Sequence, residues 1–246
     1  MVRIVKSMEL IMAVAAVCLM CFSCGNGNIG NESDNYSKPT GSLNGHDYVD
    51  LGLPSGTLWA TCNVGANKPE EKGALFAWGE TAPKETYKES TYKYSNGKYH
   101  EFTKYCYNKY HGYNYYTDNR TVLEPSDDAA TANWGSDWRM PTSDEMRELD
   151  NNCTKTWTTL NGVYGLLFTS PNGNCIFLPE AGIKDEDYTG GVGWYWSSTL
   201  DDHSTEYGKC LFFDIDVNKY GNMFLRSNFL IGHRAQGLSV RPVCSK

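Results

Sequence analysis

WRMPTSDEMREL, residues 138–149, carries the clearest structural signal in the sequence. Thr142 and Glu145 have the spacing of a capping box, in which the hydroxyl and the carboxylate each bind a backbone N–H group that the first helical turn leaves unpaired. An apolar face follows at helical spacing, formed by Met146, Leu149 and Cys153. The stretch predicts a helix over residues 143–152 with one face on a core.

Strand and turn patterns surround this helix. Alternating or apolar runs predict strands at residues 46–51, 57–64, 165–169, 175–178, 194–199 and 209–217. The turn residues SPNGN, 170–174, predict a hairpin between the third and the fourth of them. In the last strand, one face would hold Leu211, Phe213, Ile215 and Val217, and the other Cys210, Phe212, Asp214 and Asp216. We therefore expect one α+β domain over residues 43–246, with mostly antiparallel strands and long loops.

The C-terminal part combines two kinds of sequence. Residues 237–243 alternate apolar and polar side chains and predict a strand, whereas residues 224–233 fit neither a period of 2 nor one of 3.6. The mixture of large apolar, basic and amide side chains in 224–233 is typical of a recognition surface. A bent strand that packs inward is the alternative.

The Tyr-rich segment, residues 87–116, holds ten tyrosines and almost no aliphatic residues. It therefore predicts a long surface excursion without a core of its own. Its tyrosines would suit a contact surface, because Tyr gives large amphipathic area at low entropic cost. A twisted hairpin laid over the domain is the other interpretation.

Composition bounds the class of protein. The 246 residues are 21% charged and 13% aromatic, which indicates a globular chain. The net charge of −7 gives no support to nucleic-acid binding, which needs a basic stripe.

The N-terminus predicts export. Arg3 and Lys6 precede an apolar run that is too short to span a bilayer, so residues 1–23 are expected to be a signal peptide. Ser23 before Cys24 resembles a lipobox and predicts a lipid on Cys24, a flexible tether over residues 24–42 and an outer-membrane lipoprotein at the cell surface. An ordinary signal peptide with an incidental cysteine is the alternative.

Six cysteines lie beyond Cys24, at positions 62, 106, 153, 175, 210 and 244. Export permits disulfides, and six sites allow about 15 connectivities. We predict one pair, Cys62 with Cys244, because these cysteines stand near the two ends of the folded region. The alternative is that some of the six are small buried hydrophobic residues. Their spacings match no CxxC or zinc pattern.

Seven blocks in this order closely resemble the Fibrobacter succinogenes major paralogous domain family, common in surface lipoproteins of gut Bacteroidetes: YVDLGLPSG (48–56), WATCNVGA (59–66), FAWGE (76–80), WRMPT (138–142), IFLP (176–179), YWSST (195–199) and SVRPV (239–243). The resemblance covers residues 43–244. It implies a C-type-lectin-like fold, related to the formylglycine-generating enzymes, in which the N- and C-terminal strands pair and long loops lie on one side.

A narrower resemblance concerns variable proteins of diversity-generating retroelements, which end in a fixed strand preceded by positions scrambled at adenines of Asn codons. Such mutagenesis does not yield Lys, Gln, Glu, Met or Trp. Between residues 210 and 235 only Lys219 and Met223 fall outside the permitted set.

Catalytic and metal-binding motifs are sparse. The sequence lacks a Gly-x-Ser-x-Gly motif, a phosphate-binding glycine loop and a His-Glu-x-x-His motif. The five histidines have no ligand-like spacing, and the acidic stretches 185–187 and 201–202 are expected to be solvated turns rather than calcium loops. We therefore expect no enzyme, no metal and no cofactor.

Tryptophans in the family blocks are expected to pack in the core with bonded indole nitrogens, and Arg139 and Arg241 to have structural hydrogen-bonding roles. The predicted ligand-binding set is Asp201, His203, Tyr207, Tyr220, Asn222, Phe224, Arg226, Asn228, Phe229, Leu230, His233 and Gln236. The sequence thus predicts a non-catalytic, adhesin-like surface lipoprotein that binds an extracellular protein or glycan. The alternatives are a structural or accessory lipoprotein without a dedicated ligand, and an enzyme related to the formylglycine-generating group.

Overall fold

A computed structural model describes residues 36, 38–185, 189–190, 192–217 and 223–246 of the chain. The predicted signal peptide, Cys24 and most of the predicted tether lie outside these residues, as do Tyr220 and Asn222. The last part of that tether lies in strand β1, Gly41–Leu43. Within the described residues, the search for a helix long and apolar enough to cross a membrane found none.

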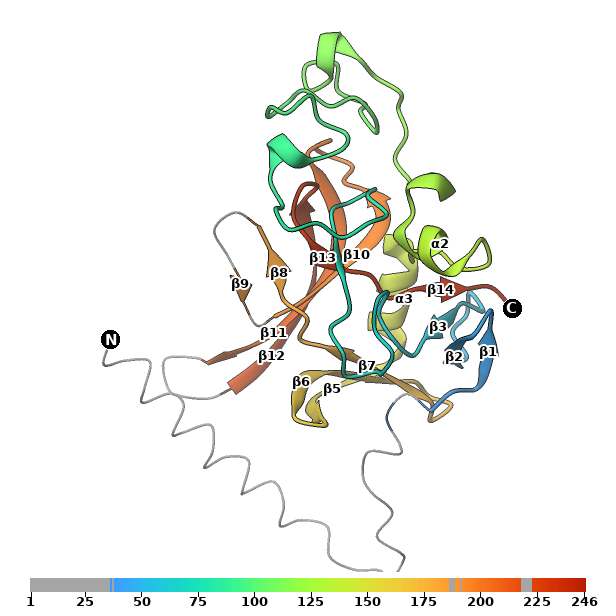
Figure 1. Ribbon diagram of the computed structural model, residues 1–246. Helices are drawn as coiled ribbons and strands as arrows, with labels where there is room; N and C mark the ends of the chain where they lie inside the picture. Colours follow the sequence, from blue (N-terminus) through green and yellow to red (C-terminus); the bar gives the residue numbers. More distant parts are fainter. Residues whose placement is uncertain (1–35, 37, 186–188, 191, 218–222) are drawn as a thin grey trace, which may run out of the picture. The chain divides into compact units, whose positions relative to one another are not determined.

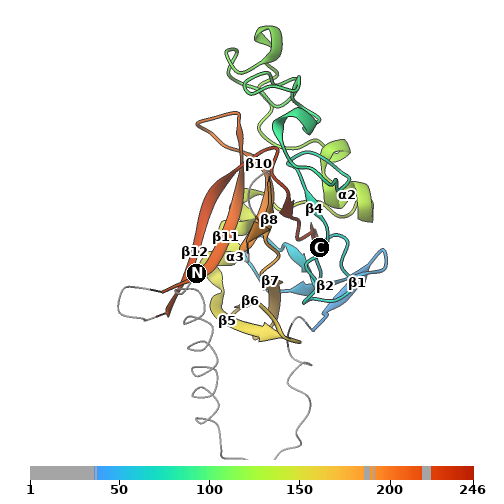
Figure 2. The same cartoon turned by 60° about the vertical axis from the view of Figure 1, so that its left-hand side comes forward.

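The main sheet has five strands in the order β12-β11-β10-β13-β4, that is Met223–His233, Tyr207–Val217, Gly193–Leu200, Leu238–Ser239 and Leu75–Phe76. All neighbours are antiparallel except β10 and β13. Strands β11 and β12 form a long ribbon, and β12 is one edge of the sheet (Figure 2). The structure is thus α+β and mostly antiparallel, as predicted.

Strand β12 corrects the prediction that residues 224–233 are irregular. It pairs residue for residue with β11, from His233 opposite Tyr207 to Met223 opposite Val217. Over residues 225–230 its side chains alternate between half-buried and exposed, but polar Ser227 lies on the half-buried face and apolar Leu230 on the exposed face. Ser227 Oγ donates to Asp150 Oδ1 at 2.9 Å, which satisfies the hydroxyl on that inner face. A polar residue on the inner face and an apolar residue on the outer face break the polar–apolar alternation, so the sequence did not show the period of 2.

A second sheet joins the two ends of the domain. Its order is β1-β2-β3-β14, the last three being His46–Asp50, Leu58–Ala60 and Val243–Cys244. The antiparallel pairing of β3 with β14 confirms that terminal strands meet (Figure 1). Strand β3 is shorter than the predicted 57–64.

The single strand predicted for residues 237–243 is wrong. That stretch divides into β13 and β14, which belong to different sheets. Between them Arg241 is fully buried, and its guanidinium donates to the carbonyl oxygens of Ala60, Thr61 and Phe177 and to Asn63 Oδ1. This side chain ties three chain segments together, so the structural role predicted for Arg241 is confirmed.

A three-stranded sheet contains the predicted hairpin. Its strands are β5, β6 and β7, at Thr154–Leu160, Val163–Thr169 and Cys175–Pro179. The pairing of β6 with β7 confirms the turn predicted at 170–174. A separate small pair is formed by β8, Ile183–Lys184, and β9, Thr189–Gly190.

Helix α3, Ser143–Asn152, confirms the helix prediction and its capping box. Thr142 Oγ1 accepts from Glu145 N at 3.2 Å, and Glu145 Oε2 accepts from Thr142 N at 2.8 Å. Its apolar face packs in a core cluster that also contains Tyr195, Leu211 and Phe213. Helix α2, Ala129–Trp134, was not predicted, because six residues are too short to show a helical period.

The Tyr-rich segment lies beyond one end of the main sheet, where both views show it (Figures 1 and 2). The prediction of a surface excursion is wrong for half of it. Tyr87, Tyr92, Tyr94, Phe102 and Tyr105 are buried in one core cluster with Trp78, whereas Tyr110 and Tyr115 are 72% and 74% exposed. The segment therefore extends the main core with aromatic rings instead of aliphatic side chains.

Tryptophan packing follows the prediction with one exception. Trp78, Trp138 and Trp196 are buried, and their indole N–H groups donate to the carbonyls of Ser197, Leu43 and Phe76. Trp59 is buried too, but its nitrogen has no hydrogen-bond partner among the described residues.

The predicted Cys62–Cys244 disulfide is wrong. No disulfide joins the six cysteines that the structure describes. The register of β14 places Cys244 opposite Leu58, and its side chain packs with Leu58, Ala60 and Trp138. Cys62 is partly exposed, with its sulfur 3.5 Å from the Thr61 hydroxyl.

Candidate functional site

The fold distributes the predicted ligand-binding residues over three places. Asp201, His203, Phe229 and Leu230 line a groove near the start of α3. Arg226 and Asn228 lie on the exposed face of the β11–β12 ribbon. Tyr207, His233 and Gln236 lie at the end of the ribbon, near the Tyr-rich segment. Phe224 belongs to β12, and nothing is described of its side chain.

The groove is a cavity of about 200 Å³ with mixed chemistry, lined by Ser143, Arg147, Asp201, Asp202, His203, Lys209, Phe229, Leu230 and Ile231. Asp201 has a structural role, since its Oδ2 accepts from the backbone N–H groups of His203 and Ser204, both at 3.0 Å. That turn leaves His203 exposed at the rim. The Arg147 guanidinium lies 5.2 Å from the centre of the Phe229 ring and covers the apolar floor.

The edge strand next to this groove presents apolar side chains to solvent. Leu230 is 39% exposed and Ile231 is 45% exposed. No strand in the described part of the chain pairs with the outer edge of β12. An unpaired edge offers a row of backbone N–H and C=O groups to an added strand. Groove and edge together form what we call the β12 surface: the nine groove residues and the outer edge of Met223–His233.

Arg226 already has partners within the ribbon. Its Nε donates to Asp214 Oδ1 at 2.8 Å, its Nη2 donates to Asp214 Oδ2 at 2.5 Å, and Nη1 lies 3.4 Å from Asp216 Oδ2. The bonds to Asp214 raise the pKa of Arg226. Two carboxylates thus balance this cation, so it is a weaker ligand anchor than the sequence suggested.

The end of the ribbon holds a second cavity, of about 300 Å³. His233 stacks on Tyr99 with ring centres 5.4 Å apart, and its Nε2 lies 3.7 Å from Glu89 Oε2. Burial lowers the pKa of His233 and raises that of Glu89, so both groups are shifted toward their neutral forms. Gln236 holds this end in place, because its Oε1 accepts from His233 N at 2.9 Å and its Nε2 donates to Asp185 Oδ2 at 3.0 Å.

Beside this cavity the fold brings together two histidines and a glutamate that the sequence prediction missed. His100 Nε2 lies 2.5 Å and His111 Nδ1 3.3 Å from the same Glu206 oxygen, Oε1. The other oxygen, Oε2, accepts from the Tyr99 hydroxyl at 2.5 Å. Burial lowers the pKa of His111, and the charge of His100 lowers it further. The linear spacing of the histidines gave no sign of this group, because only the fold brings His100 and His111 to Glu206.

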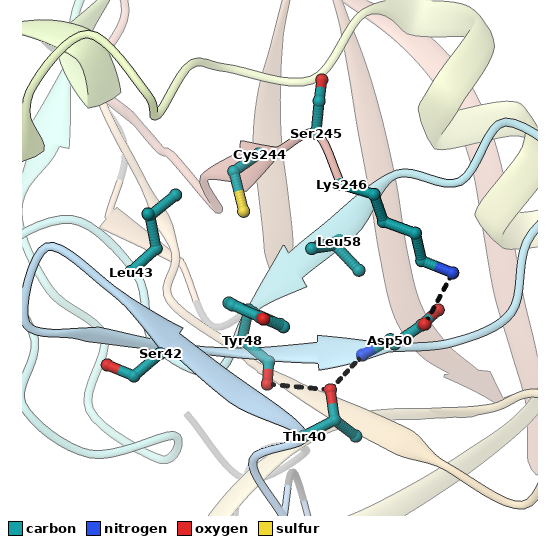
Figure 3. Close-up of a pocket in the computed structure, with 9 residues that line it drawn as sticks. All are labelled: Thr40, Ser42, Leu43, Tyr48, Asp50, Leu58, Cys244, Ser245 and Lys246. Atoms are coloured by element: carbon teal, nitrogen blue, oxygen red, sulfur yellow. Dashed lines mark hydrogen bonds and ion pairs between the residues drawn. The ribbon is translucent and has the colours of Figure 1, made fainter.

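A third cavity, of about 470 Å³, is lined by none of the predicted ligand-binding residues. It lies between β1, β2 and the C-terminal residues (Figure 3). Lys246 Nζ forms an ion pair with Asp50 Oδ2 at 2.7 Å, and Asp50 N donates to Thr40 Oγ1 at 2.7 Å. These contacts join the two ends of the domain and pair the side-chain charges of Lys246 and Asp50 with each other.

Comparisons of the chain with family models, with curated proteins and with solved structures found no match.

Proposed function

We propose that the chain is an exported, lipid-anchored, non-catalytic binding protein of the cell surface, and that its ligand is an extracellular protein. The observation that carries the proposal is the β12 surface, where an unpaired edge strand displays Leu230 and Ile231 beside a polar-rimmed groove. Adjacent exposed aliphatic side chains next to an open sheet edge are typical of strand addition, in which backbone bonds give affinity and side-chain pockets give specificity.

The chemistry of this surface favours a protein over a glycan. Leu230 and Ile231 are aliphatic, and the nearby aromatic ring of Phe229 is half-buried beneath Arg147. The described part of the β12 surface offers no open aromatic face on which a sugar ring could stack, whereas a peptide strand supplies both backbone partners and apolar side chains. Lys209, paired with Asp202 at 2.5 Å, and Arg147 form a charged rim around the apolar centre.

We also propose that the chain has a C-type-lectin-like fold. Support comes from the pairing of β3 with β14 and from the long Tyr-rich segment, which are the features that the resemblance implied. Diversification of residues 210–235 would act on the exposed positions of β12, since Cys210 and Arg234 are buried. A near-copy of the coding segment for 194–243, differing at adenines and lying beside a reverse-transcriptase gene, would support it.

The ligand class is tested with the full chain on arrays of extracellular proteins and of glycans. We expect capture of a protein, and at least about tenfold weaker capture by Ile231→Asp, because a charge would face an apolar partner. Tyr164→Asp is the matched control, since Tyr164 is an apolar strand residue with similar exposure, 43%. Hydrogen exchange should slow at β12 amides in the complex.

Three outcomes would overturn parts of the proposal. Capture of glycans alone would make the ligand class wrong. Equal binding by Ile231→Asp and Tyr164→Asp would place the site elsewhere. Capture of neither class would favour a structural lipoprotein without a dedicated ligand. The anchor is tested separately by Cys24→Ala, which should move the protein from the membrane fraction to the soluble one.

A further inference from the structure

We propose that His100, His111 and Glu206 bind one divalent transition-metal ion of the Zn²⁺ class. The three side chains offer two imidazole nitrogens and one carboxylate oxygen, and these atoms lie within 4.8 Å of one another. This site is separate from the β12 surface and does not depend on the proposed function.

Backbone contacts hold the three residues together. Phe102 N donates to the carbonyl of His111 at 2.8 Å, and Tyr113 N donates to the carbonyl of Phe102 at 2.9 Å, so two parts of the Tyr-rich segment run side by side. Glu206 is fixed from the other side, where its carbonyl accepts from Arg234 N at 3.0 Å. Main-chain bonds of three segments thus bring the three ligand residues together without an ion.

The spacing of the ligand atoms suits a single ion. Metal–nitrogen and metal–oxygen bonds of about 2.0–2.2 Å in a tetrahedral site separate neighbouring ligand atoms by roughly 3.3 Å. His111 Nδ1 and Glu206 Oε1 are 3.3 Å apart, and His100 Nε2 lies closer, at 2.5 Å. His100 Nε2 is buried but makes no aligned hydrogen bond to a described residue. A small outward shift of the His100 ring would open the space for an ion between the three atoms.

The surroundings orient the carboxylate. The Tyr99 hydroxyl donates to Glu206 Oε2, which leaves Oε1 directed at the two imidazoles. Such outer hydrogen bonds fix the geometry of ligands in metal sites. The Thr205 hydroxyl contacts His111 Nδ1 at 3.3 Å, and it would turn away when an ion occupies that nitrogen.

The donor set selects the class of ion. Two imidazoles and one carboxylate suit Zn²⁺ and similar ions, whereas Ca²⁺ and Mg²⁺ need mostly oxygen ligands. Three protein ligands leave a fourth position for water or for an external ligand. The His100 side chain is 41% exposed, so the ion has a path from solvent.

The test uses the full chain after removal of metals with a chelator. Titration calorimetry with ZnCl₂ should show one ion per chain, and CaCl₂ and MgCl₂ should show none. CoCl₂ should give the visible absorption bands of a four-coordinate ion. His111→Ala and Glu206→Gln should each weaken Zn²⁺ binding at least about tenfold, and Tyr99→Phe by a smaller factor. His46→Ala, which removes a histidine of β2 that stacks on Trp134, should leave binding unchanged.

Two results would overturn the assignment. One is absence of Zn²⁺ binding by the folded wild-type chain, which would leave a hydrogen-bonded network only. The other is Zn²⁺ binding that survives both ligand substitutions. If circular dichroism shows that Glu206→Gln does not fold, His100→Ala decides instead, since this more exposed ligand can be removed without opening the core.

Discussion

The Arg234 guanidinium donates a hydrogen bond to the Tyr92 hydroxyl at 2.9 Å, and this contact joins residues 142 positions apart in the chain. Tyr92 extends this connection to Trp78, because its hydroxyl donates to the carbonyl of Trp78 at 2.7 Å. Arg234 is fully buried and also donates to the carbonyls of Lys104, Tyr105 and Thr205. One cation at the end of β12 therefore fixes the Tyr-rich segment against the main sheet.

Replacement of Arg234 should be among the most damaging single changes. Arg234→Leu leaves three carbonyls without their donor and removes a cation that lies 4.5 Å from the centre of the Phe102 ring. We expect a loss of about 3–5 kcal/mol in the free energy of unfolding, measured by urea denaturation. The control, Arg226→Leu on the exposed face of β12, should cost much less, because solvent-exposed ion pairs contribute little to stability. Similar losses for the two variants would contradict the role of Arg234.

The sequence could not reveal this arrangement. Arginine is usually exposed, so nothing in residues 224–236 pointed to a buried guanidinium, and its partners come from a distant segment. The Tyr-rich segment looked unable to form a core because it lacks aliphatic residues, yet its rings pack around Arg234. By contrast, α3 and the β6–β7 hairpin were predictable, since capping and turn chemistry depend on neighbours in sequence.

The prediction of the site residues from the sequence was limited in the same way. The groove beside α3 gathers Asp201, His203, Phe229 and Leu230 from the predicted set, because all stand near the β11–β12 ribbon in sequence. The sequence prediction missed the group of His100, His111 and Glu206. The glutamate is distant in sequence from the two histidines, and only the fold brings the two histidines to it. The position of both histidines in one aromatic segment was the only hint that the sequence offered.

A glycine in β12 should be irreplaceable for steric reasons. Gly232 lies opposite Gly208 in the ribbon, and a Cβ atom at Gly232 would lie 2.6 Å from the Trp196 ring. Because Trp196 is fully buried, it has no room to move. Gly232→Ala should cost about 1–3 kcal/mol by urea denaturation. Asn228→Ala, at an exposed position of the same strand, should cost under about 0.5 kcal/mol. Equal stabilities would show that the Trp196 packing tolerates the methyl group.

The thiols should differ in reactivity. Burial raises the pKa of Cys153 and of Cys244 to about 11 and also raises that of Cys210, so these groups form little thiolate at pH 8. Cys62 and Cys175 are partly exposed. Alkylation of the native chain, followed peptide by peptide with mass spectrometry, should modify Cys62 and Cys175 before the buried thiols. A Cys62–Cys244 linked peptide in a digest without reductant would contradict the structure.

The capping glutamate of α3 should give the domain a specific acid sensitivity. Burial by itself would raise the pKa of Glu145, but hydrogen bonds from Arg139, from Thr142 N and from Thr57 outweigh it and lower the pKa to about 2. The ordinary value is 4.5, so the charged form stabilises the fold fully above about pH 5, and this contribution is lost as the pH falls toward 2.

Glu145→Gln tests the direction of this pH dependence of stability directly. At pH 7 the variant should be less stable by about 1–2 kcal/mol, a figure that allows for solvent screening. The difference from wild type should shrink steadily between pH 5 and pH 2, because protonation removes the same interaction from the wild-type chain. Urea denaturation across this range measures it, with Glu85→Gln at an exposed position as the control that should follow wild type. A difference that stays constant down to pH 2 would mean that the Arg139 bonds to Glu145, at 2.5 and 2.7 Å, do not depend on its charge.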